Sequence, residues 1–300
     1  DMKADDVCVV ELSSFQLHTM KRSADIAVVT NVTPNHLDWH TDFDEYKNSK
    51  KAVFKYQKSG GRVVLNYDND ITREFGKETD NAVYFSRKEI LDNGFCLIGD
   101  KVVRRINGRD EREVLDINNI FIPGMHNVEN YMAAAAAVEG LAEDGIIRRT
   151  AIDFKGVPHR IEFIREVDGV KYYNDSIASS PARTTAGLNS FGDKKVILIA
   201  GGYDKKIPFD DFGKVVCDHV KALVLVGVTS EKIENAVRYA ENFNNLPIYR
   251  CTEFKQAAEK AKEVAKDGDT VILSPACASF DLFKNFEERG NTFKNIVKGF

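Results

Sequence analysis

Long apolar runs are missing from the sequence: none approaches the ~20 residues that a membrane-spanning helix needs, and no basic-then-apolar signal peptide opens the chain. Cysteine is sparse too, with five residues and no CxxC pair: Cys8, Cys96, Cys217, Cys251 and Cys277. Scattered cysteines argue against a disulfide framework or a zinc cluster and are typical of a reducing compartment. We therefore expect a cytoplasmic protein with no membrane partner.

A large excess of charge of either sign is also missing. The formal net charge of -4 gives no general attraction to nucleic acid, so an anionic ligand has to be held by local cations. With 43% hydrophobic and 29% charged residues, the composition is that of an ordinary globular protein. A length of 300 residues favours about two domains.

Two phosphate-binding motifs are absent. The pattern GxxxxGK[ST] occurs nowhere in the sequence, and no GxGxxG follows the apolar run VILIAGG at 196–202. The second absence disfavours a nucleotide-binding oxidoreductase, which is the reading that this run would otherwise suggest.

The first half of the chain alternates apolar runs with helical patterns. The runs Val7–Val10 and Ile26–Thr30 flank a helical QLHTM segment, and Arg62–Asn66 follows a lysine-rich helix. This alternation predicts βαβ units and a mostly parallel sheet. Residues 81–122 read as short strands with charged turns, which indicates an antiparallel addition, and a helix is predicted from 127 to 143 with Gly145 as its stop.

A second βαβ series follows residue 157. Strands are predicted at Ile161–Val167, Val170–Tyr173, Val196–Ala200, Ala222–Val226 and Thr270–Leu273. Helices are predicted after Pro181, at 230–239 and at 254–265. The fold class is therefore α/β.

The stretch from Asp269 to Phe293 reads as a buried strand, a turn of small residues and then a helix. In the turn, Ala276–Ser279 would let a ligand approach the backbone, where free N–H groups and the helix macrodipole favour an anion. The alternative is an ordinary strand-to-helix turn with Ser279 as its N-cap. Phe286 would add an apolar wall, and Gly290 within the helical pattern indicates close packing.

Lys50 and Glu11 occupy positions unusual for charged residues. Lys50 falls on the inward face of its predicted helix, where burial would keep its amine partly neutral; the alternative is a lysine that snorkels at the edge of the core. Glu11 closes the run VCVVE, at the carboxyl edge where open α/β sheets bind ligands. The loop NVTPNHLDWH adds His36, Asp38 and His40, although a loop histidine is more often a surface residue than a ligand.

In their order and spacing, eight segments resemble the Mur ligase family over nearly the whole chain: VVELSSFQL (9–17), NVTPNHLDWH (31–40), YKNSK (46–50), GMHNVEN (124–130), PHRIE (158–162), YNDS (173–176), GGYDKK (201–206) and SPACASFDLFKNFEERG (274–290). The resemblance implies a truncated, P-loop ATPase-like central domain over 1–156 and a Rossmann-like amino-acid-binding domain over 157–300. The phosphate loop and the N-terminal UDP-binding domain of the family would then be missing, and we expect negligible ATP turnover by the chain as printed.

The segments are most similar to the family members that add D-glutamate to UDP-N-acetylmuramoyl-L-alanine in peptidoglycan synthesis, a step needed for cell wall, cell shape and cell division. The implied reaction uses ATP and Mg²⁺ and passes through an acyl phosphate. The implied enzyme is a cytoplasmic monomer. A folylpolyglutamate synthase, which also joins glutamate through an acyl phosphate, is disfavoured by SPACAS and FKNFEERG, and a non-catalytic nucleotide-binding fragment stays open.

The resemblance also implies roles for individual residues. Glu11 and His36 match metal positions, and Lys50 matches a lysine carbamylated by carbon dioxide beside the metal. The positions that match ATP contacts are Asn127 and Asn130 for the base, and His159, Arg160 and Asp175 for the phosphates and ribose.

The implied D-glutamate pocket contains Ser279, Phe286 and Lys205. Ser179 stands where the family usually has a threonine. Ile177 departs from the family pattern, which commonly has a lysine there, so one cation for the glutamate is missing.

Overall fold

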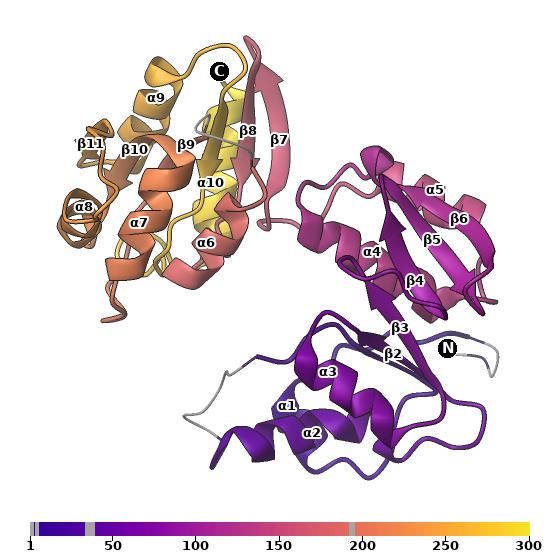
Figure 1. The fold of residues 1–300 in the computed structure, drawn as a ribbon. Helices are drawn as coiled ribbons and strands as arrows, with labels where there is room; N and C mark the ends of the chain where they lie inside the picture. The colour runs from indigo at the N-terminus through magenta and orange to yellow at the C-terminus, as the bar shows by residue number, and fades with distance from the viewer. Residues whose placement is uncertain (1–2, 4–5, 34–39, 192–195) are drawn as a thin grey trace. The chain divides into compact units, whose positions relative to one another are not determined.

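A computed structural model describes the chain except for residues 1–2, 4–5, 34–39 and 192–195. The described chain folds as two compact units (Figure 1). Unit 1 comprises the residues up to Ile120 together with His126–Ile152, and unit 2 comprises Phe121–Met125 together with Asp153–Phe300. No helix in the described ranges has the length and apolar character needed to cross a membrane. Division into domains at 156/157 stays a prediction.

Unit 1 contains a six-stranded sheet in the order β1-β2-β3-β4-β5-β6. The strands are β1 (Ile26–Val29), β2 (Arg62–Asn66), β3 (Ala82–Ser86), β4 (Gly94–Ile98), β5 (Lys101–Ile106) and β6 (Asp110–Asp116). Pairing is parallel from β1 to β4 and antiparallel from β4 to β6. The predicted antiparallel addition is therefore confirmed for β4–β6 and wrong for β3, which continues the parallel part.

The prediction of a strand at Val7–Val10 is wrong. The structure assigns no strand there, and the side chains of Val7, Val9 and Val10 are 71%, 94% and 61% exposed. An apolar run becomes a strand only where a neighbouring strand and a covering layer receive it, and no described strand pairs with these residues.

The helices of unit 1 are α1 (Ser14–His18), α2 (Phe43–Lys55), α3 (Asp70–Phe75), α4 (Met125–Val138) and α5 (Asp144–Asp153). Ser13 and Gln16 form a capping box at α1, and Asp42 caps α2 by accepting from the backbone N–H of Glu45 at 2.7 Å. The helix predicted to run to residue 143 ends at Val138, because the chain turns at Gly140 with a φ of 81°. Gly145, its predicted stop, lies inside α5.

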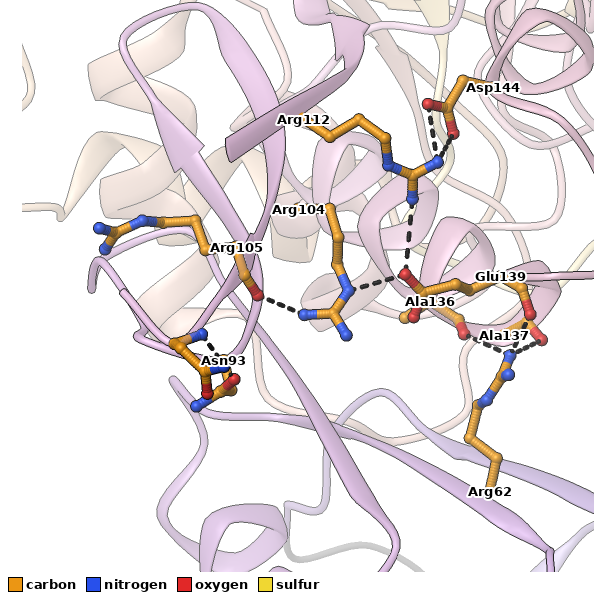
Figure 2. Close-up of polar contacts among 10 residues, drawn as sticks. Arg62, Asn93, Arg104, Arg105, Arg112, Ala136, Ala137, Glu139 and Asp144 are labelled. Carbon is orange, nitrogen blue, oxygen red and sulfur yellow. Dashed lines mark hydrogen bonds and ion pairs between the residues drawn. The ribbon is translucent and has the colours of Figure 1, made fainter. Parts of the chain in front are cut away.

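Arg62, at the start of β2, caps the carboxyl end of α4 (Figure 2). Its Nη1 donates to the backbone oxygens of Ala136, Ala137 and Glu139 at 3.2, 3.1 and 2.8 Å. The last carbonyls of a helix have no partner within the helix and carry a partial negative charge, so a guanidinium satisfies both needs.

The carboxylate of Glu139 joins the antiparallel strands to the same helix end. Its Oε1 accepts from Nε of Arg104 at 2.8 Å and from Nη2 of Arg112 at 3.4 Å, and Nη1 of Arg112 lies 2.9 Å from both carboxylate oxygens of Asp144 in α5 (Figure 2). These contacts fasten β5 and β6 to the carboxyl end of α4 and to α5.

Unit 2 contains a second six-stranded sheet, in the order β11-β10-β9-β12-β8-β7. The strands are β7 (Glu162–Val167), β8 (Val170–Asn174), β9 (Val196–Ala200), β10 (Val220–Val226), β11 (Ile248–Cys251) and β12 (Thr270–Leu273). Only the β7–β8 pair is antiparallel. Because β12 returns to lie between β9 and β8, the carboxyl ends of these strands form the edge where doubly wound sheets bind ligands.

Helices cover both faces of this sheet. They are α6 (Pro181–Leu188), α7 (Asp210–His219), α8 (Ser230–Arg238), α9 (Phe254–Val264) and α10 (Phe286–Lys298). Alternate strand residues pack against α6, α7 and α8 on one face, and the intervening ones pack against α9 and α10 on the other. The α/β fold class is confirmed. The sequence predicts neither α7 nor β11.

The helix expected directly after the small-residue turn begins later than predicted. α10 starts at Phe286 and is capped by Asn285, whose Oδ1 accepts from the backbone N–H of Glu288 at 2.8 Å. Leu282 and Phe283 therefore lie outside the helix, and the alternative of Ser279 as an N-cap is wrong.

Candidate functional site

In unit 1, α2 carries Lys50, which the charge of Glu11 reaches electrostatically. Lys50 is half-buried, and its Nζ lies 5.6 Å from the centroid of the Tyr46 ring. Burial lowers the pKa of Lys50, and the charge of Glu11 acts in the opposite direction. The structure thus brings these two predicted residues within electrostatic reach and favours a neutral amine more than in an exposed lysine.

The segment after Glu11 is tied to α2 by two histidines. Nδ1 of His18 lies 3.0 Å from Oγ of Ser49, and Nε2 of the buried His40 lies 3.0 Å from Oγ of Ser14. The first contact joins α1 to α2, the helix that carries Lys50, and the second joins α1 to the segment just before α2. His40 is thus an internal packing residue in the structure.

His36, the third predicted metal residue, lies outside the described residues, as does Asp38 of the same loop. Within the ranges that are described, no three histidine, cysteine or carboxylate side chains are grouped so as to hold a metal ion. Glu11, an exposed carboxylate within electrostatic reach of the Lys50 amine, is an oxygen donor of the kind that Mg²⁺ prefers.

Asn127 and Asn130 lie on the first turns of α4. Nδ2 of Asn130 donates to Oδ1 of Asn127 at 3.2 Å, so the i, i+3 spacing brings the two amides together. Paired amides of this kind offer both donors and acceptors to a planar polar group.

In unit 2, the carboxyl end of β8 carries a buried polar group. Oδ1 of Asp175 accepts from the backbone N–H of Ile161 at 3.2 Å, and Oδ2 accepts from Oγ of Ser274 at 2.6 Å. Burial raises the pKa of Asp175 to about 6, although these hydrogen bonds and the charges of Arg160 and Arg183 act to lower it.

His159 is held from three sides. Its backbone N–H donates to Glu162 at 2.9 Å, Nδ1 lies 3.0 Å from Nδ2 of Asn174, and its ring meets that of Phe286 edge-on at 5.7 Å between centroids. Burial lowers the pKa of His159, which favours the neutral imidazole. By contrast, the neighbouring Arg160 is exposed.

The predicted pocket residues gather around the turn after β12. Nζ of Lys205 donates to the backbone oxygen of Ser179 at 3.3 Å, and the backbone N–H of Tyr203 donates to Ala278 at 2.9 Å, which places the GGYDKK loop beside the turn. The backbone oxygen of Phe286 accepts from Ser176 at 2.8 Å. Ser279 is buried in the turn itself.

The sequence did not single out Arg289, which lies beneath this turn and is 2% exposed. Its guanidinium donates to Oγ and O of Ser176, to O of Cys277 and to O of Ala278 at 2.9 to 3.1 Å. Burial lowers the pKa of Arg289 to about 10. The feature of the sequence that could have identified Arg289 is its position three residues after Phe286, which places it on the inward side of α10.

Two family models match the chain: the Mur ligase middle domain over residues 1–138 and the Mur ligase, glutamate ligase domain over residues 159–277. The chain is 56% identical to the UDP-N-acetylmuramoylalanine--D-glutamate ligase of Acetivibrio thermocellus and 52% identical to that of Clostridium novyi, in each case over 99% of its length. It spans 64% of the length of each of these relatives.

Two solved structures share the fold. The UDP-N-acetylmuramate-alanine ligase MurC of Thermotoga maritima aligns over 95% of this chain and 62% of its own, with a TM-score of 0.68 at 17% identity. The MurF ligase of Thermotoga maritima in complex with ADP aligns over 92% and 63%, with a TM-score of 0.62 at 17% identity. Since the two models together account for most of the sequence and the relatives extend over nearly all of it, the chain belongs to the Mur ligase family.

Proposed function

We propose that this chain serves an ATP-dependent ligase that adds D-glutamate to UDP-N-acetylmuramoyl-L-alanine in peptidoglycan synthesis, in the cytoplasm. The observation that carries the proposal is the identity of 48 to 56% to relatives that bear this activity in their names, extended over 99% of the chain. Because the chain spans 64% of the length of these relatives, only the contribution of its own residues to the ligase reaction is proposed.

The proposed reaction has two steps. The γ-phosphoryl group of ATP passes to the carboxylate of the UDP-linked substrate, which gives ADP and an acyl phosphate. The amine of D-glutamate then attacks the acyl carbon, the C–O bond to phosphate breaks, and the nitrogen loses a proton as the amide forms. Asn127 and Asn130 would contact the base, and His159 and Arg160 would contact the phosphates.

Lys50 is proposed as the carbamylated residue. A neutral amine adds to carbon dioxide and releases a proton, which turns a cation into an anion beside Glu11. The lowered pKa of Lys50 supports this role because it enlarges the neutral fraction. Glu11 and the carbamate, with His36, would hold Mg²⁺, which supplies positive charge to the phosphate oxygens when bound.

The amino-acid pocket is proposed at the turn after β12. Lys205 would pair with a carboxylate of D-glutamate, Ser279 and Ser179 would supply polar contacts, and Phe286 would form a wall. Because Ile177 brings no charge, the remaining donors should each carry a larger share of the binding of an anion.

The test is ligand-observed NMR titration of the chain with D-glutamate and, separately, with L-glutamate. We expect D-glutamate to bind more tightly, and Lys205→Ala and Ser279→Ala each to weaken it by roughly ten- to a hundredfold, since each removes a partner of a charged group. The control is Lys206→Ala, the adjacent lysine, which should bind as the unaltered chain does. Equal binding of the two enantiomers, or variants that bind D-glutamate normally, would contradict the proposal.

A further inference from the structure

A chain of buried hydrogen bonds runs through unit 2 from the loop before β7 to the turn after β12. Oδ1 of Asp175 accepts from the N–H of Ile161, and its Oδ2 accepts from Oγ of Ser274 at 2.6 Å. Oγ of Ser274 lies 3.0 Å from Oγ1 of Thr184 in α6, and Oγ1 of Thr184 accepts from the N–H of Ala276 at 3.0 Å. Ser274 and Thr184 are fully buried.

The proton order along this chain follows from the donors available. Ser274 has one hydroxyl proton and gives it to the carboxylate of Asp175, so the proton between the two hydroxyls comes from Thr184. Each hydroxyl therefore accepts one hydrogen bond and donates one, and every bond points toward Asp175. Such an ordered chain polarises its members and makes each bond depend on the next.

The two backbone groups at the ends of the chain have left-handed conformations. Ile161 has a φ of 44° and Ala276 a φ of 58°, values that residues with a Cβ rarely adopt. A β-branched isoleucine is especially disfavoured there, and such conformations persist only where surrounding contacts impose them. The N–H of each residue is bound by a member of the same hydrogen-bonded chain.

Both strained residues adjoin the proposed ligand contacts. Ile161 directly follows His159 and Arg160, and Ala276 begins the turn that leads to Ser279. We propose that Thr184 and Ser274 are positioning residues that, through Asp175, couple the loop carrying His159 and Arg160 to the turn carrying Ser279. Neither hydroxyl needs to touch substrate in this role. Instead, they fix the backbone from which the nucleotide and amino-acid contacts project.

Hydrogen exchange of the whole chain tests the coupling without any ligand. In Thr184→Val, which keeps the shape of the side chain but removes the hydroxyl, we expect the amides of Ala276 and Ile161 both to exchange about tenfold faster or more. Thr184→Ser, which restores the hydroxyl, should keep both amides protected. The matched control is Thr185→Val, the next residue of α6, which is not a member of the hydrogen-bonded chain.

Faster exchange at Ala276 alone would overturn the proposal, because it would show a local bond without coupling. Equal acceleration throughout unit 2, including Leu223 in β10, would also overturn it, since Thr184 would then act only on overall stability. If Thr184→Val does not fold, Ser274→Ala interrupts the same path and is expected to expose both amides.

A second measurement rests on the proposed function. The affinity for D-glutamate should fall about tenfold in Thr184→Val and return in Thr184→Ser. If the unaltered chain does not bind D-glutamate, the proposed function fails while hydrogen exchange still decides the coupling. If it binds and Thr184→Val binds equally well, the positioning role is wrong and the proposed function stands.

Discussion

The imidazole of His159 fills the space that a side chain at Gly290 would need. A Cβ at position 290 would lie 2.2 Å from Nδ1 of His159 and 2.9 Å from Oδ1 of Asn174. α10 can therefore pass this close to the PHRIE loop only with glycine at that position. The packing reason that the sequence suggested for a glycine inside a helical pattern is found in this contact.

Gly290→Ala should destabilise unit 2 although alanine is the better helix former. Helix propensity favours alanine by about 1 kcal/mol, but overpacking a buried contact typically costs about 1–3 kcal/mol and here displaces His159. Urea unfolding followed by fluorescence measures the difference. The control is Gly145→Ala in α5, where nothing lies within 4 Å of the added Cβ, so no loss of stability is expected. A Gly290→Ala variant as stable as the unaltered chain would contradict this account of the contact.

The pKa of Lys50 should lie below the ordinary value of a lysine side chain. Burial lowers its pKa while Glu11 partly restores it, so Glu11→Gln should lower the pKa of Lys50 further. The measurement is NMR titration of ¹³C-dimethylated lysines, with the signal assigned by Lys50→Arg and with Lys55, an exposed lysine of the same helix, as the internal control. A higher pKa of Lys50 in Glu11→Gln than in the unaltered chain would show that the two groups do not interact as described.

Asp175 should make unit 2 less stable as the pH rises from about 4 to about 6. Its pKa in the folded chain is about 6, above the unfolded value of about 3.9, so the folded state holds the proton more tightly. The stabilisation from the tighter proton binding is fully present below the pKa of the unfolded state. It is lost as the pH rises through the pKa of the folded state, and it amounts to roughly 2–3 kcal/mol. Asp175→Asn lacks this titration, so its stability relative to the unaltered chain should rise over that interval in urea unfolding. A constant difference between pH 4 and 7 would exclude a raised pKa.

The sequence predicts strands correctly where the apolar run lies inside a sheet, with a paired strand on each side. Arg62–Asn66, Val196–Ala200 and Thr270–Leu273 coincide with β2, β9 and β12, all with neighbours on both sides. The run at Val7–Val10 has the same local pattern and is exposed, because pairing depends on a partner strand that composition does not encode. β11 at the sheet edge, with only four residues and a charged one among them, gave too weak a pattern.

The sequence predicts which segments contribute residues to the candidate site. It does not predict the hydrogen bonds that join those segments. Lys205 and Ser179 were assigned to one pocket through resemblance, and the structure places them in hydrogen-bond contact. Thr184 and Ser274 carry no local signal, since their importance lies in bonds between residues 90 and 99 positions apart. A threonine in a helix is ordinarily unremarkable in sequence, and only tertiary structure shows what its hydroxyl binds.

Replacing Arg289 should strongly destabilise unit 2, because this side chain is buried and its guanidinium is fully engaged. Its planar guanidinium serves four acceptors at once, among them the backbone oxygens of Ser176 and Cys277, and Arg289→Met would remove the donor that these two buried oxygens have. Each unsatisfied buried group costs about 1–3 kcal/mol, so a total loss of roughly 2–6 kcal/mol is expected from the two oxygens.

Arg289→Lys distinguishes geometry from charge. Lysine keeps the positive charge but presents a single ammonium, which cannot span the acceptors of the fork, so we expect a loss of stability between those of the unaltered chain and Arg289→Met. The control is Arg250→Met, whose side chain is 49% exposed and shares Glu234 with Arg238, so Glu234 keeps a partner and a smaller loss of stability than in Arg289→Met is expected. Chemical denaturation of the three variants makes the comparison. If Arg289→Lys were as stable as the unaltered chain, the charge alone would suffice, and the turn after β12 would not depend on the guanidinium fork that holds its carbonyls in place.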